Sequence, residues 1–182
     1  MDDRLLGIYL NDHLAGATGG VELMRRLTGR NRGTEYAEPL QEITGEIEED
    51  RKNLELVMSR VGVAPNPVKI TAARAAERVG RLKLNGRLLG YSPLSRLEEL
   101  EAIRIGVEGK LALWRSLRET RGADPRLEGI DLDQLIARAE RQRDSLEALR
   151  LRAAKGAFGA APARSRPASA RSGSSTAPRS TP

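Results

Sequence analysis

The chain has 182 residues and a formal net charge of +6, from 31 Lys and Arg against 25 Asp and Glu. Because it has no cysteine, the sequence excludes disulfides, thiolate metal sites, iron–sulfur clusters and cysteine nucleophiles. Its single histidine, His13, excludes any metal site that needs two histidines. No apolar run approaches the roughly 18 residues that a membrane span needs. No signal peptide is recognisable either, so we expect a cytoplasmic protein without membrane contact.

The first predicted helix covers residues 3–28. Apolar residues recur in it at steps of three and four, which is typical of a helix with one face on a core. Glycines interrupt this helix, and each costs about 1 kcal/mol relative to alanine. Such a glycine-rich face is tolerable if another backbone packs closely against it. The apolar face carries Leu6, Leu10, Leu14, Ala17, Val21 and Met24, and the glycines are Gly7, Gly16, Gly19 and Gly20.

The second predicted helix covers residues 34–61 and has the most regular apolar spacing. Thr34 is expected to be its N-cap, and Gly62 is expected to end it. One carboxylate, Asp50, falls within the apolar seam, where we expect it to pair with a Lys or Arg from a neighbouring helix. The seam residues are Tyr36, Leu40, Ile43, Ile47, Asp50, Leu54, Val57 and Val61.

Three further helices follow in the prediction. Residues 67–84 begin with Pro67, which suits a first helical turn, and present a small apolar face. Ser92 is expected to cap a helix over residues 93–120. A fifth helix opens at Gly129 or Asp131 and is closed by Gly156 and Gly159. The seams of the last two helices are Leu97, Leu100, Val107, Leu111 and Trp114, and Leu132, Leu135, Ala139, Gln142, Leu146, Leu149 and Ala153.

The predicted fold class is all-α, an antiparallel bundle of four to five helices in one domain over residues 3–156. No segment alternates apolar and polar residues for long enough to form a strand. The last residues, from Ala160 onward, contain only Ala, Ser, Pro, Arg, Thr and Gly. Without large apolar side chains they cannot offset the entropy of ordering, so we predict a disordered tail over residues 157–182.

Carboxylates at inward positions form a candidate site for one hard cation. Helical bundles hold metal pairs with a Glu from each of two helices and a Glu-x-x-His from each of the others. Asp12 and His13 lie in the middle of the first helix, Asp50 in the second, and Glu101 and Glu108 on the fourth. Oxygen ligands of this kind suit iron or manganese. The alternative for each acid is a solvated or salt-bridged side chain, and for His13 a partly exposed helix residue.

Several stretches resemble the ferritin-like superfamily, in particular its small stress-protein branch. The run from Glu46 to Glu55 is similar to the second helix of that family. The opening of the first helix, residues 8–12, is similar to that of the branch, with Asp12 where the family has Glu. The last two helices also match the branch in order and length. The resemblance implies a ferritin-like bundle over about residues 5–155.

The same resemblance shows which ligands are missing. Its two Glu-x-x-His pairs correspond to Ile47–Asp50 and Ala139–Gln142, so neither pair keeps its ligand set. The resemblance therefore implies a bundle without the standard di-iron centre, for which no cofactor is expected. The alternative is a single iron or manganese ion held by carboxylates.

A basic segment lies between the third and fourth predicted helices. It has no acid from residue 79 to residue 96, and it is suited to bind an anion, a nucleic-acid backbone or an acidic partner. The alternative is ordinary pairing with Glu98, Glu99 and Glu101. Because no nucleotide or helix-turn-helix motif accompanies it, any nucleic-acid contact is predicted to be weak and nonspecific. The positive residues are Arg78, Arg81, Lys83, Arg87 and Arg96.

The absence of a complete catalytic set favours a function without chemistry. Our first hypothesis is a non-catalytic interaction or structural protein that self-associates or binds a protein partner. The glycine-rich first helix and the polar residue within a seam motivate it. The second hypothesis is a carboxylate-ligated metal protein, and the third is a basic bundle that associates with nucleic acid.

Overall fold

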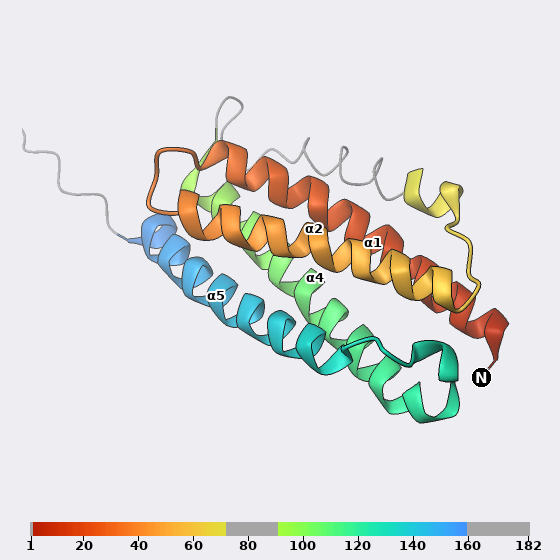
Figure 1. Cartoon of the computed structure of the whole chain (residues 1–182). Coiled ribbons are helices and arrows are strands. Elements are labelled where there is room, and N and C mark those ends of the chain that lie inside the picture. The colour runs from red at the N-terminus through yellow and green to blue at the C-terminus, as the bar shows by residue number, and fades with distance from the viewer. Residues whose placement is uncertain (1, 72–90, 160–182) are drawn as a thin grey trace, which may run out of the picture.

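Four long helices form most of the part of the chain that the structure, a computed structural model, describes: residues 2–71 and 91–159. They are α1 (Asp3–Arg30), α2 (Ala37–Arg60), α4 (Pro93–Thr120) and α5 (Leu132–Phe158) (Figure 1). Two short 3-10 turns, η1 (Arg121–Ala123) and η2 (Pro125–Leu127), join α4 to α5. Since these residues contain no strand, the predicted all-α class is confirmed. None of the described helices is both long and apolar enough to cross a membrane.

Side-chain caps explain where three of these helices begin. The carboxylate of Asp2 accepts the N–H groups of Arg4 and Leu5 in the first turn of α1. Ser92 caps α4, as the sequence predicts. Asp131 caps α5, which decides between the two predicted starts, Gly129 and Asp131. The prediction for α2 is wrong, because that helix begins at Ala37 and Thr34 does not cap it. The hydroxyl of Thr34 instead donates to the Asn31 carbonyl within the preceding loop, at 2.7 Å.

Two helices continue past a glycine near their C-terminal ends, although α5 then ends just before Gly159, one of the two glycines expected to close it. α1 passes Gly29 and ends at Arg30, where the side chain of Asn31 donates to the Leu27 carbonyl at 2.7 Å and extends the last turn. α5 passes Gly156 and ends at Phe158, so the predicted tail boundary at residue 157 falls inside its last turn. A glycine weakens a helix but adopts helical angles readily, which is why it marks an end only where the chain also turns. Gly62 does turn, with φ +74°, and α2 ends before it as predicted.

Residues 67–71 form a short helical segment that begins at Pro67, as predicted. The side chain of Asn66 accepts the N–H groups of Val68 and Lys69 at its start. The rest of the third predicted helix, residues 72–84, lies outside the described residues. The predicted tail from residue 160 onward lies outside them too. So do four residues of the basic segment: Arg78, Arg81, Lys83 and Arg87.

The helices pair with their neighbours along the chain. Near the loop between α1 and α2, the hydroxyls of Thr28 and Thr44 are hydrogen-bonded at 2.8 Å. Near the turns between α4 and α5, Arg118 forms an ion pair with Asp133 at 3.2 Å. In each pair, therefore, the end of the first helix lies beside the beginning of the second, as Figure 1 shows.

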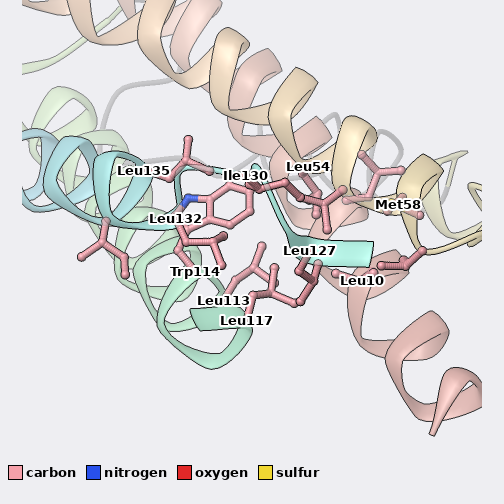
Figure 2. Packing of buried hydrophobic residues seen from close by; sticks show 14 of the residues in the cluster. Leu10, Leu54, Met58, Leu113, Trp114, Leu117, Leu127, Ile130, Leu132 and Leu135 are labelled. Carbon is pink, nitrogen blue, oxygen red and sulfur yellow. The ribbon is translucent and has the colours of Figure 1, made fainter. Parts of the chain in front are cut away.

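Two hydrophobic clusters fill the interior, one toward each end of the bundle. The first surrounds Trp114, which is 1% exposed, and Figure 2 shows Leu132 and Leu135 of α5 close to its ring. The second lies toward the loop between α1 and α2. Its most buried members include Met24, Leu40, Leu100 and Leu146.

Candidate functional site

Between the two clusters, each long helix carries one polar residue that is buried or nearly so, and we call this set the polar layer. It consists of Thr18 of α1, Asp50 of α2, Lys110 of α4 and Gln142 of α5. On every helix, the apolar residues to one side belong to one cluster and those to the other side belong to the other. The hydroxyl of Thr18 donates to the Leu14 carbonyl of its own helix, at 2.8 Å. The other three residues bond to one another across the bundle.

Asp50 is the centre of the polar layer and is only 2% exposed. The Lys110 ammonium donates to its Oδ2 atom, and the Nη2 atom of Arg138 lies 2.6 Å from Oδ1. The amide of Gln142 donates to Oδ2 at 3.1 Å. The expectation that Asp50 pairs with a Lys or Arg from a neighbouring helix is therefore confirmed, with one cation from α4 and one from α5.

The orientation of Gln142 is set by groups on both sides of its amide. Its Oε1 atom accepts from the Lys110 ammonium, and its Nε2 atom donates to Asp50 and, at 2.9 Å, to Glu46. Since the carbonyl faces the only ammonium and the NH₂ group faces two carboxylates, the reverse orientation would place like groups together. Gln142 thus links the ammonium to both acids of α2.

Burial and charge act in opposite directions on the pKa values of the two cations that pair with Asp50. Burial lowers the pKa of Lys110, and the neighbouring Asp50 carboxylate offsets only part of this effect. For Arg138, burial also acts to lower the pKa, but Asp50 and Glu49 outweigh it and the net shift is upward. Removing one partner from such a buried set leaves an uncompensated charge, which is far more costly than losing an exposed ion pair.

The other candidate metal ligands lie apart from Asp50, each with a partner of its own. Asp12 is largely exposed and pairs with Lys69 at 2.6 Å, and the ring of His13 meets that of Tyr9 edge-on at 4.6 Å between centroids. Burial lowers the pKa of His13. Among the acids of α4, Glu101 lies 3.5 Å from Arg150, and Glu108 lies 3.9 Å from Arg104. Within the described ranges, no three His, Asp or Glu residues come together in a group that could hold a metal ion.

An open cleft of about 870 Å³ lies between α1 and α4, with α2 at its floor. Asp50 and Lys110 of the polar layer line it, and the candidate residues Asp12 and His13 lie along it. Small residues from both helices form much of its walls. They are Ala15, Gly16, Ala17, Gly19 and Gly20 of α1 and Ala102, Gly106 and Gly109 of α4.

Four of the glycines in this cleft have no close neighbour among the residues that the structure describes. A Cβ atom added to Gly16, Gly20, Gly106 or Gly109 would meet nothing within 4 Å. Among the described residues, therefore, no backbone packs closely against Gly16 or Gly20 of α1. These wall positions carry no side chain that would fill the cleft.

Arg96 is the one residue of the predicted basic site that the structure describes. Its guanidinium lies over the ring of Tyr36 at 4.4 Å and over Tyr91 at 5.6 Å, and it donates to the side chain of Asn31. Burial raises the pKa of Tyr91 to about 12. Arg96 is thus used within the bundle, where it joins the loop after α1 to the start of α4.

Lys110, Arg138 and the cleft were not predicted from the sequence. A signal for Lys110 was present, because it follows Val107 by three positions and precedes Trp114 by four, so it shares their face of the helix. A lysine at that spacing facing Asp50 on another helix marks an internal ion pair. The cleft had no comparable signal, because it depends on the distance between two helices.

No protein-family model matches this chain, and no match is found among curated proteins or solved structures. The features of the molecule that bear on its function are therefore the polar layer and the cleft.

Proposed function

We propose that this chain is a non-catalytic interaction protein, built as an antiparallel, ferritin-like bundle in which a lysine ammonium takes the place of a metal ion. The observation that carries the proposal is the position of the Lys110 ammonium. It lies between an oxygen of Asp50 and an oxygen of Gln142, deep between two apolar clusters. Oxygen atoms around a central cation are what a metal site provides, and here the chain supplies the cation itself.

The ferritin-like arrangement is supported by where these residues fall. Asp50 and Gln142 are the positions at which the resemblance places the histidines of the two Glu-x-x-His pairs, and both bond to Lys110. The pairing of helix ends with helix beginnings, for α1 with α2 and for α4 with α5, supports the antiparallel topology. Because the chain's own ammonium already lies among these oxygens, we expect the layer to have a structural role.

Metal loading tests this proposal directly. The full chain, purified without chelator, is loaded anaerobically with ferrous iron and separately with manganese. Retained metal, oxygen consumption and the melting temperature are then measured. We expect no retained metal and no thermal shift, because a ligand that binds only the native state would raise the melting temperature. Two metal ions retained per chain, and lost in an Asp50→Ala variant, would contradict the proposal.

A Lys110→Met variant tests whether the ammonium occupies the position of a cation. It removes the ammonium while keeping a side chain of similar length, and it leaves the oxygens of Asp50, Gln142 and Glu46 in place. If the ammonium occupies the place of a cation, this variant should gain affinity for manganese relative to the wild type. Equal retention by both chains would show that the layer is not a cation site at all.

Self-association belongs to the same proposal and is measured separately. The sequence predicts it from small-residue helix faces, and the structure adds that several α1 glycines face open space. Sedimentation velocity over a range of concentrations should show a species larger than the monomer. A single monomeric species throughout would reject self-association and would leave the interaction with another protein as the remaining form of the proposal.

A further inference from the structure

The cleft between α1 and α4 is bridged at its two ends and open between them. At one end, Arg26 and Arg30 of α1 both pair with Glu99 of α4 at 3.1 Å. At the other end, the hydroxyl of Tyr9 lies 3.4 Å from that of Ser116. These bridges hold the two helices at a set separation, so the space between them does not depend on a filling side chain.

The size and lining of the cleft fit a small apolar molecule. Its volume of about 870 Å³ falls within the range of roughly 300–1,000 Å³ that is common for small-molecule sites. The small residues of α1 and α4 leave its walls without bulky side chains, and larger apolar side chains lie deeper. These deeper residues are Leu23, Ile47, Leu54, Ile103, Val107, Leu113 and Trp114.

Lys110 provides a hydrogen-bond donor on the cleft side of the polar layer. An ammonium group has three N–H donors, and the structure gives it two acceptors, Asp50 and Gln142. Lys110 lines the cleft, as do Gly106 and Gly109, which precede it by four positions and one position on α4 and carry no side chain. One donor is therefore available to an acceptor that enters the cleft.

Charge balance indicates which kind of acceptor this is. Lys110 and Arg138 lie among three carboxylates, those of Asp50, Glu49 and Glu46, so negative charge is in excess. An anionic ligand group at the floor would add to this excess in a mostly buried site, which carries a large desolvation cost, and a cationic group has no lone pair to accept the N–H. A neutral oxygen satisfies the remaining donor without that cost.

From these observations we propose that the cleft binds an uncharged, elongated apolar molecule with one carbonyl oxygen, and that this oxygen accepts the third N–H of Lys110. The proposal concerns a ligand site and does not depend on the ferritin-like assignment. The apolar part of the molecule lies along the glycine and alanine walls, where its burial supplies most of the affinity. The carbonyl sets its position along the cleft.

Binding of octan-2-one to the full chain tests the site. Trp114 is the only tryptophan and lines the cleft, so its fluorescence reports occupancy, and calorimetry provides a second readout. We expect saturable binding of octan-2-one, with octanoate and octylammonium at least roughly tenfold weaker, because octanoate adds negative charge and octylammonium cannot accept a hydrogen bond from Lys110. Equal or tighter binding of either charged probe, or no saturable binding of the ketone, would overturn the proposal.

Two variants and one matched control locate the ligand. Gly106→Leu fills the cleft from α4 and should abolish binding, whereas Gly45→Leu adds the same side chain at an equally open glycine of α2 outside the lining. Lys110→Met should weaken octan-2-one binding by roughly tenfold, the value of a hydrogen bond to a charged group. Circular dichroism of each variant verifies that the helices are retained. Undiminished binding by folded Gly106→Leu would overturn the site, and undiminished binding by folded Lys110→Met would overturn the role of the ammonium.

Discussion

Helix α4 has two very different neighbours. Toward α5 it forms ion pairs along its length, among them Arg104–Glu147 at 2.9 Å and Arg115–Glu140 at 2.7 Å. Toward α1 it presents alanine and glycine to a cleft. One helix can therefore carry a closed interface and an open one, because the size of its side chains changes from one face to the other.

In this bundle, the regions that stabilise the fold are different from the region that stays open. The polar layer lies where the two regions meet, since Lys110 lines the cleft while it bonds to Gln142 of α5. Apolar burial on either side of the layer stabilises the fold, and the glycine-lined walls contribute little to it. The following predictions test this division, beginning with the largest expected effect.

Truncation of a leucine should lower the free energy of unfolding much more at the packed side of the bundle, where α5 lies, than in the cleft between α1 and α4. Leu146 of α5 is fully buried, so Leu146→Ala should lower the free energy of unfolding by about 2–5 kcal/mol through lost burial and the cavity left behind. Leu23→Ala, at a partly buried leucine that lines the cleft, should cost clearly less. Urea unfolding of both variants measures the difference, and equal losses would contradict the division.

Filling the cleft wall with a methyl group should stabilise the protein. Gly106 is helical and a Cβ there meets nothing within 4 Å, so Gly106→Ala should raise the free energy of unfolding by up to about 1 kcal/mol through helix propensity. Gly33→Ala is the control, because Gly33 has φ +73° and a side chain is strained there. We expect thermal melts to rise for the first variant and fall for the second. A fall for Gly106→Ala would show that the cleft wall is packed after all.

The ion pairs on the closed side should give a small pH dependence. Arg150, with Arg104 contributing less, lowers the pKa of Glu147 below its ordinary value of 4.5. The stabilisation from Glu147 is therefore complete above pH 4.5 and is lost as the pH falls below that value. Melting temperatures of the wild type and Glu147→Gln should differ slightly at pH 7 and converge in acid. A difference that persists unchanged in acid would exclude this origin.

The positions of the long helices could be predicted to within a few residues, because the apolar spacing and the capping residues that define them lie close together in the sequence. The spacing of Leu40, Ile43 and Ile47 determined which face of α2 is buried, and the cap at Ser92 could be predicted from the proline that follows it. The error at Thr34 has the same local scale, since a hydroxyl can serve either a helix start or the loop before it. Such errors displace a boundary by a few residues and leave the arrangement of the helices unchanged.

The candidate site was only partly predictable. Asp50 was recognisable as a charge within an apolar seam, and its need for a cationic partner follows from the cost of burying an unpaired carboxylate. The cations that pair with Asp50 could not be predicted, because Lys110 and Arg138 come from helices far along the chain. The separation of Asp12, Glu101 and Glu108 from Asp50 could not be read from spacing for the same reason.

The sequence alone determined the class of this protein and the inward face of each long helix, because apolar periodicity acts within a few turns of backbone. It also determined that one acid would be buried and would need a partner. Only the tertiary structure decided which side chains meet in the polar layer and that the α1 glycines line an open cleft. Those features depend on distances between helices that are distant in the chain. Such distances result from the packing of all the helices together, so no single stretch of sequence specifies them.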